Sequence, residues 1–317
     1  MQSTSVSKNK LSIASSRASP SVETRFKRWM GLMLISPWLI GLLIFKLLPI
    51  LASLVFSFTD FHLLNPNQVQ FVGLDNYQSV FKDGYVRDVF LKTIKLALVV
   101  IPLQTLASIA VAALLSSQRL WKRHILRMLF FLPSIIPAFS ATLMWQGFVN
   151  PSTGWLNRIF LNPFGLASWN IFSSRGTSQP LLMFSSLWTI GPGMLIMMGA
   201  MQGISSDIYE SALMDGAGRL VRFFKITMPL ITPAIFFSLV LNLTAVFGGA
   251  ILLDRGSTFR GIDLSSYDAY VNFELFDMFH LGYASSLAWV FFIFVMIVVL
   301  ILFRTSKSWV YFPDREN

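Results

Sequence analysis

The segment Ile208–Leu230 reads IYESALMDGAGRLVRFFKITMPL and separates two apolar stretches of the chain. Just before and inside it, Asp207 and Glu210 have the spacing of a capping box, which predicts a helix that begins at Ile208. Loops between apolar segments of a membrane protein are usually short and featureless. A structured loop in a chain without a catalytic motif indicates a docking surface for another subunit.

The second half of this segment predicts a bend and another short helix. Gly216 and Gly218 are expected to end the first helix, because glycine readily adopts the left-handed angles of a helix terminus. A second helix is expected from Arg219 to Thr227, and Pro229 is expected in the first turn of the next apolar segment. The two helices would share an apolar face made of Tyr209, Ala212, Leu213 and Phe223.

The composition indicates a membrane protein. The 317 residues are 54% hydrophobic and 13% charged, which is too apolar for an ordinary soluble domain. Six segments contain the about 20 mostly apolar residues that a span needs, which predicts an all-α polytopic protein with six transmembrane helices. Prolines inside several segments predict broken helices, which favour a transporter over a passive anchor. The six segments run approximately Met30–Leu51, Leu96–Leu115, Ile125–Phe148, Leu181–Met201, Met228–Leu252 and Ala284–Phe303.

The net charge of +10 is distributed unevenly along the chain. Basic residues gather before the first segment, between the second and third, after the fourth and after the sixth, which places them all on one side of the membrane. By the positive-inside rule, both termini are then cytoplasmic. The charge therefore reports topology, with a minor contribution from anionic lipid, rather than nucleic-acid binding. These residues are Lys8, Lys10, Arg17, Arg25, Lys27, Arg28, Arg119, Lys122, Arg123, Arg127, Arg219, Arg222, Lys225, Arg304, Lys307 and Arg315.

The remaining features define the domain organisation and exclude several chemistries. Residues 1–24 predict a disordered cytoplasmic tail, residues 25–310 a transmembrane domain with a cytoplasmic loop at 205–228, and residues 311–317 a second tail. The chain has no cysteine, which excludes disulfides and thiol catalysis. It also lacks a Gly-x-x-x-x-Gly-Lys phosphate loop and a His-Glu-x-x-His metal motif. We therefore expect neither a catalytic site nor a metal site in this chain.

The loop resembles that of the integral-membrane permease subunits of binding-protein-dependent ABC importers. Their signature is Glu-Ala-Ala, three residues, Gly, nine residues, Ile, one residue and Leu-Pro. Two positions depart from it, since Ser211 replaces Ala and Met228 replaces Leu. The positions that match are Glu210, Ala212, Gly216, Ile226 and Pro229.

Other segments are similar to the sugar-importing branch of these permeases, the maltose and glycerol-phosphate type. Residues 248–277 depart most from that branch, because they lack its Gly-Gly-Pro segment, so the substrate is less firmly indicated than the class. The similar segments are Ser36-Pro37, Pro49, Phe71–Tyr77, Phe130–Pro133, Asn150-Pro151 with Gly154, and Leu281–Ser285.

The resemblance implies a type I importer fold and a defined set of partners in the bacterial inner membrane. Two homologous permeases would pair to form the pore, and each would dock its bent loop on one of two cytoplasmic ATPase subunits. A solute-binding protein would deliver a sugar, glycoside or polyol from outside. The chain itself would need no cofactor, since ATP and magnesium would bind to the partner ATPase. The expected coupling residues are Glu210, Ser211, Ala212, Asp215, Gly216, Ile226 and Pro229.

Sugar recognition needs polar partners and an aromatic platform. The fifth segment is favoured, because in the sugar permeases the helix after the docking loop lines the site. Helix–helix hydrogen bonding and packing are equally good explanations for each of these side chains. The candidates are Asn242, Thr244, Phe247 and Gly248 in that segment, Trp188 in the fourth, and Tyr283 at the start of the sixth.

Alternative functions remain open at this point. A polyamine permease of the same superfamily would be favoured by acidic residues lining the pore, and the spans offer none. An intramembrane enzyme would need paired catalytic groups within the spans. A channel that works without an ATPase would not need the capped loop.

Overall fold

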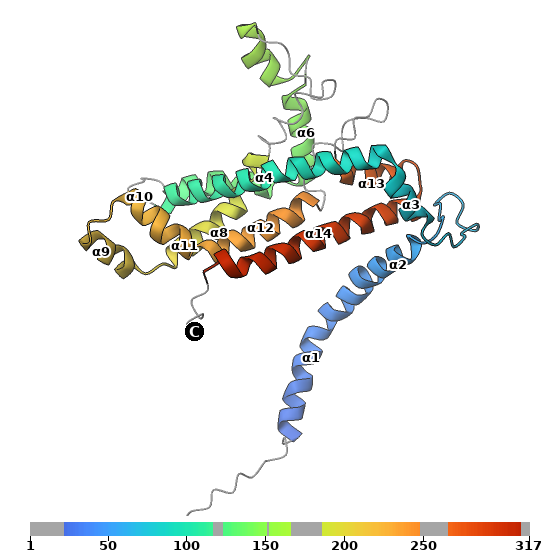
Figure 1. Cartoon of the computed structure of the whole chain (residues 1–317), viewed down its shortest axis with the longest axis horizontal. Coiled ribbons are helices and arrows are strands. Elements are labelled where there is room, and N and C mark those ends of the chain that lie inside the picture. Colours follow the sequence, from blue (N-terminus) through green and yellow to red (C-terminus); the bar gives the residue numbers. More distant parts are fainter. Residues whose placement is uncertain (1–21, 117–122, 151, 166–185, 248–265, 312–317) are drawn as a thin grey trace, which may run out of the picture. The chain divides into compact units, whose positions relative to one another are not determined.

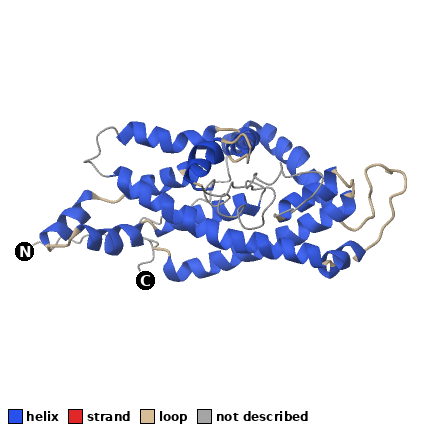
Figure 2. Cartoon of the chain, turned by 90° about the horizontal axis from the view of Figure 1, so that it is seen from above, coloured by secondary structure: helices blue, strands red, loops and turns tan. Residues whose placement is uncertain are grey.

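The computed structural model describes residues 22–116, 123–150, 152–165, 186–247 and 266–311. In these ranges the chain forms helices joined by loops, and no strand is present (Figure 2). By their internal contacts, residues 1–53 and 54–317 form two compact units. Each unit is described by itself below.

The first unit is dominated by one long helical segment. It consists of α1 (Val22–Leu42), the π-helical η1 (Leu43–Leu47) and α2 (Leu48–Phe56), whose last residues belong to the second unit. None of the candidate span Met33–Phe56 is buried within the chain. Helix α1 begins at Val22, so the last residues of the predicted tail are helical, whereas residues 1–21 lie outside the described residues.

The second unit is organised around α4 (Gly84–Ser116). This helix packs against α8 (Gly191–Gln202), α12 (Thr232–Phe247) and α13 (Tyr267–Phe276). Helix α14 (Leu281–Trp309) packs against α12 and α13, so α4, α8, α12 and α14 lie side by side (Figure 1). The shorter elements are α3 (Asp75–Lys82), α5 (Arg123–Phe131), η2 (Leu132–Ile135), α6 (Ala138–Phe148), η3 (Leu156–Leu161), η4 (Asn162–Phe164), α9 (Ser206–Met214), α10 (Arg219–Arg222), η5 (Phe223–Thr227) and α11 (Met228–Leu230).

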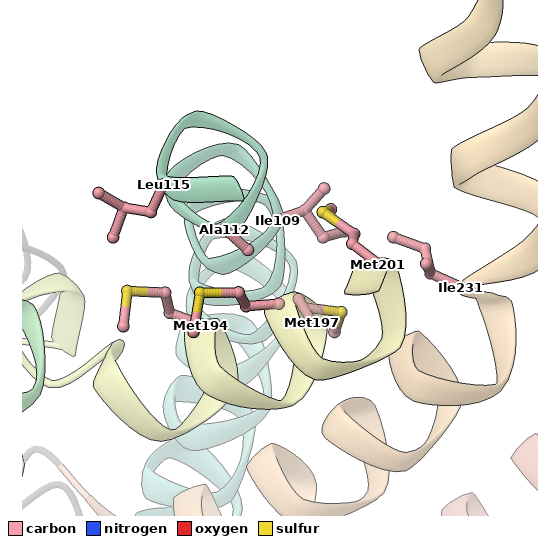
Figure 3. Packing of buried hydrophobic residues seen from close by; sticks show 8 residues of the cluster. Ile109, Ala112, Leu115, Met194, Met197, Met201 and Ile231 are labelled. Atoms are coloured by element: carbon pink, nitrogen blue, oxygen red, sulfur yellow. The ribbon is translucent and has the colours of Figure 1, made fainter. Parts of the chain in front are cut away.

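One end of α4 packs into a core that is rich in methionine. Met194, Met197 and Met201 of α8 lie beside Ala112 and Leu115 of α4 (Figure 3). Ile231, which connects α11 to α12, is fully buried in the same cluster. Methionine is unbranched and flexible, so it fills the irregular space between helices that cross closely.

The other end of α4 is covered by α13. Tyr267 is fully buried there, and its backbone N–H donates to Oγ1 of Thr93 on α4 at 2.8 Å. Its hydroxyl donates to the carbonyl of Leu287 on α14 at 3.0 Å. Burial raises the pKa of the Tyr267 phenol, so the hydroxyl remains a neutral donor. One tyrosine thus joins α13 to both long helices.

Three described helices are long and apolar enough to span a membrane, and a bent pair makes a possible fourth. The three are Met33–Phe56, Gly84–Ser116 and Leu281–Trp309, and the pair is Arg219–Leu230 with Thr232–Ala245. The predicted span Ile125–Phe148 is interrupted, because 3-10 segment η2 separates α5 from α6. Pro133 lies in η2 and Pro137 precedes α6, and a proline cannot donate the backbone hydrogen bond that would continue a helix. Only part of the predicted span Leu181–Met201 is described, and its helix begins at Gly191.

Two helical glycines give a matched test of the packing at the start of α14. A Cβ at Gly282 would clash with the carbonyl oxygen of Thr59, whereas a Cβ at Gly199 of α8 would meet nothing within 4 Å. We expect Gly282→Ala to destabilise the protein by about 1–3 kcal/mol through overpacking. Gly199→Ala should be neutral or stabilising by up to about 1 kcal/mol, because alanine favours helix. Thermal unfolding of the purified chain in detergent measures both, and equal midpoints would contradict the packing described here.

Candidate functional site

The loop between α8 and α12 begins with a serine cap. Ser205 is the N-cap of α9, and its hydroxyl accepts from the backbone N–H of Asp207 at 3.3 Å. The predicted capping box of Asp207 and Glu210 is therefore wrong, because the helix starts two residues earlier than expected. Asp207 instead lies in the first turn, where a carboxylate interacts favourably with the helix dipole. Glu210 is exposed on the same helix.

The end of α9 has the geometry of a Schellman motif. The N–H of Gly216 donates to the carbonyl of Leu213 at 3.0 Å, and that of Ala217 donates to the carbonyl of Ala212 at 2.9 Å. Gly216 has a φ of 75°, which confirms its predicted role as the left-handed terminator. Asp215 is the exposed C-cap residue just before it.

The next helix is continuous from α10 through η5 to α11. It begins after Gly218, which is the N-cap of α10 and has an ordinary φ of −65°. The prediction that Gly218 is a second left-handed helix terminator is therefore wrong. Helix α9 is tied to it by a 2.8 Å hydrogen bond between the hydroxyls of Tyr209 and Thr227. The chain bends by 63° between Arg219–Leu230 and Thr232–Ala245. Pro229 is exposed and lies near the end of the helix Arg219–Leu230, two residues before the bend.

The apolar face of the loop differs from the predicted one. Tyr209, Ala212 and Phe223 are half-buried, and Phe223 packs on the methionine-rich core. Leu213 is 53% exposed, and sequence reasoning missed that Met214 beside it is 89% exposed. Of the predicted coupling residues not yet described, Ser211 is exposed and Ile226 is half-buried. The other exposed apolar side chains are Ile208, Leu220, Val221 and Phe224.

The two helices of the loop carry opposite charges. Helix α9 and its C-cap contain the exposed carboxylates Asp207, Glu210 and Asp215 without a basic residue. The helix from Arg219 to Leu230 contains Arg219, Arg222 and Lys225 without an acidic residue. The loop thus presents one acidic and one basic surface.

A polar seam, made of Gln104, Thr105, Ser108, Ser238 and Asn242, lies along α4 and α12. Nδ2 of Asn242 donates to Oγ1 of Thr105 at 3.4 Å. Nε2 of Gln104 donates to the carbonyl of Ser186 at 2.9 Å. Ser108 and Ser238 are buried next to Gly193 of α8.

Asn242 thus makes the helix–helix contact that the sequence left open as an alternative to solute binding. The other members of the seam were missed. They could have been found by the four-residue spacing of Gln104 with Ser108 and of Ser238 with Asn242, which places polar groups on one face of an apolar helix.

The other predicted substrate residues lie apart from the seam. Thr244 is exposed and donates to the carbonyl of Leu241 at 2.8 Å. Trp188 packs edge-on against Trp145, with ring centroids 5.6 Å apart, in a separate aromatic cluster. The side chain of Phe247 and all of Gly248 lie outside the described residues.

Tyr283 belongs to the cluster at the far end of α4. It packs there with Tyr267, whose N–H is bonded to Thr93. Thr93 precedes Thr105 by twelve residues on α4, which corresponds to a rise of about 18 Å. The structure therefore does not bring Tyr283 and Asn242 to one site.

Comparisons with known proteins point to one family. Residues 104–310 match the family described as "Binding-protein-dependent transport system inner membrane component". The chain is 34% identical to the probable ABC transporter permease protein YesP of Bacillus subtilis over 293 residues, which cover 90% of this chain and 93% of that protein. It is 36% identical over 221 residues to the sn-glycerol-3-phosphate transport system permease protein UgpA of Escherichia coli, covering 69% and 74% of the two chains.

A solved structure shares the fold. It is a bacterial ABC transporter involved in the import of the acidic polysaccharide alginate. The TM-score is 0.76 at 21% identity, and the alignment covers 90% of this chain and 97% of that one. A second structure of an alginate transporter, in complex with a pentasaccharide-bound periplasmic protein, gives the same values.

The two loop glycines give a matched test of the left-handed turn that ends α9. Alanine at Gly216 would hold a φ of 75°, which costs a non-glycine residue about 1–2 kcal/mol, whereas Gly218 already has an ordinary φ. We expect Gly216→Ala to speed hydrogen exchange of the α9 amides by about five- to thirtyfold. Gly218→Ala should leave this exchange nearly unchanged. The same exchange rate in both variants would show that Gly216 does not determine the stability of α9.

Proposed function

Because the chain belongs to the family of binding-protein-dependent transport system inner membrane components, we propose that it forms half of a solute pore driven by a separate ATPase. The observation that carries the proposal is the loop of residues 205–228, with its capped, acidic first helix and the left-handed turn at Gly216 that ends it. A rigid element transmits displacement, and ATP can move a pore only through contacts that differ between its two states.

We further propose six membrane-spanning segments with both termini in the cytoplasm. The interrupted helices α5 and α6, the segment that ends in α8, and α12 would each make one span. This arrangement places the basic residues beside the segment ends on the cytoplasmic side. The described helices and the charge pattern support this topology.

The proposed partners are a second homologous permease, two ATPase subunits that bind ATP and magnesium, and an extracytoplasmic solute-binding protein. The name of the family supports the last of these, as does the periplasmic protein in the alginate complex. The proposed coupling residues are Glu210, Ser211, Ala212, Asp215, Gly216, Ile226 and Pro229. The exposed carboxylate of Glu210 would pair with a basic residue of the ATPase.

The proposed solute is a sugar, glycoside or polyol. The relative named for sn-glycerol-3-phosphate transport and the structural neighbour that imports alginate support a polyhydroxylated compound. Within this chain, Asn242 is the first candidate for solute contact. Among the described residues its amide bonds only to Thr105, and its oxygen and second N–H both suit hydroxyl groups.

Charge reversal at Glu210 tests the docking role. We expect Glu210→Lys to reduce the amount of ATPase that copurifies with the chain by at least about tenfold, because a like-charge contact costs several kcal/mol at an interface. Asp88→Lys is the matched control, since this exposed carboxylate lies at the other end of the molecule on α4. Equal copurification of both variants at equal membrane expression would refute docking through Glu210.

Two substitutions separate solute binding from helix packing at Asn242. If Asn242 contacts the solute, Asn242→Ala raises the solute concentration for half-maximal transport by about tenfold. Thr105→Val breaks the same interhelical hydrogen bond, so it should leave that concentration unchanged. Equal effects of both substitutions on transport and on thermal unfolding would assign Asn242 a structural role only.

A further inference from the structure

The helix that leads into α12 has a favourable orientation for a membrane surface. It runs from Arg219 to Leu230 and meets Thr232–Ala245 at 63°. Twelve residues of helix are about 18 Å long, so at this angle the helix advances only about 8 Å along the axis of α12. The headgroup layer on one side of a bilayer is about 5–8 Å thick. If α12 crosses the membrane along the bilayer normal, the axis of the helix from Arg219 to Leu230 therefore advances by about the thickness of that layer and runs mainly along the surface.

One face of this helix is apolar and exposed. Leu220 is 74% exposed and Phe224 is 62% exposed, and their four-residue spacing places them on the same face. Val221 beside them is 46% exposed. Phe223 and Thr227, next to this face, instead contact the methionine-rich core and Tyr209. Apart from the edge-on contact of the Phe224 ring with Phe223, whose centroids are 5.1 Å apart, the apolar strip remains largely exposed in the part of the chain that the structure describes.

Basic groups lie beside this strip. Arg219 and Lys225 are exposed, and the half-buried Arg222 has an Nε atom that is buried without a hydrogen-bond partner among the described residues. No acidic residue lies between Arg219 and Leu230. A helix with an apolar face and basic flanks is the type that lies in the interface of an anionic membrane. The acidic α9 has the opposite charge and suits a basic protein surface instead.

We propose that the helix Arg219–Leu230 lies in the cytoplasmic leaflet and binds anionic phospholipid headgroups. Leu220 and Phe224 enter the boundary of the acyl chains, while the exposed Arg219 and Lys225 contact lipid phosphates. The inference rests on the proposed function, which places the loop on the cytoplasmic side. The loop then has two partners, with α9 bound to the ATPase and the basic helix bound to the membrane.

The absence of cysteine allows a direct test with single labels. An environment-sensitive fluorophore is attached to Leu220→Cys, Phe224→Cys or Met214→Cys in the full chain, which is reconstituted in vesicles with or without the copurified ATPase. The vesicles contain phosphatidylcholine alone or mixed with phosphatidylglycerol. We expect the emission of the labels at 220 and 224 to become brighter and to shift to the blue with phosphatidylglycerol. High salt should reverse both changes, because it screens the charges. The label at 214 should respond to the ATPase and not to the lipid.

A charge variant makes the test quantitative. With the label at 224, the double variant Arg219→Gln/Lys225→Gln should lower the ratio of lipid-bound to lipid-free helix about 25-fold, which is about fivefold for each charge. Arg304→Gln is the matched control, because it removes an exposed positive charge from α14 and leaves the helix intact.

The outcomes separate this inference from the proposed function. Labels at 220 and 224 that respond to the ATPase and not to phosphatidylglycerol would assign the helix to a protein partner and overturn lipid binding. Labels that respond to neither would also overturn it. A lipid response at 224 combined with no ATPase response at 214 would support lipid binding and contradict the docking role of α9.

Discussion

The burial of Ile231 fixes the loop of residues 205–228 to the rest of the second unit. This side chain lies where the helix from Arg219 bends into α12, and it is fully enclosed by the cluster between α4 and α8. Protein interiors are packed as densely as organic crystals, so a displaced side chain forces its neighbours to rearrange. A force on the loop therefore reaches α4 and α8 directly, without passing through a flexible connection.

Prolines shape these helices in two ways. Each π-helical segment of the described residues is followed directly by a residue and a proline, at Leu48-Pro49, Asn162-Pro163 and Met228-Pro229. A proline ring collides with the carbonyl four residues before it, and the wider π turn gives that carbonyl room. In contrast, α4 continues through Pro102, whereas the chain near Pro133 leaves the α-helix. The proline alone therefore does not decide between these outcomes.

Local signals in the sequence were sufficient for most of the loop of residues 205–228. Its two helices and the left-handed Gly216 depend on nearby residues only, so spacing predicts them. The start of α9 was misplaced because Ser205 and Asp207 are both good caps, and spacing does not rank them. The pair of Asn242 and Thr105 could not be predicted, since the two residues are 137 positions apart and meet only when α12 packs on α4. Which residues face one another across two helices depends on the tertiary packing, and local sequence patterns do not contain it.

The methionines between α4 and α8 are protected from oxidants, in contrast to exposed ones such as Met214. Met194 and Met197 are fully enclosed, and Met198 and Met201 nearly so. Their thioethers are shielded for as long as the two helices remain in contact, and any separation exposes them. Conversion to the polar sulfoxide would then oppose closure. The extent of sulfoxide formation at these four methionines would therefore increase with the fraction of time that the two helices are separated.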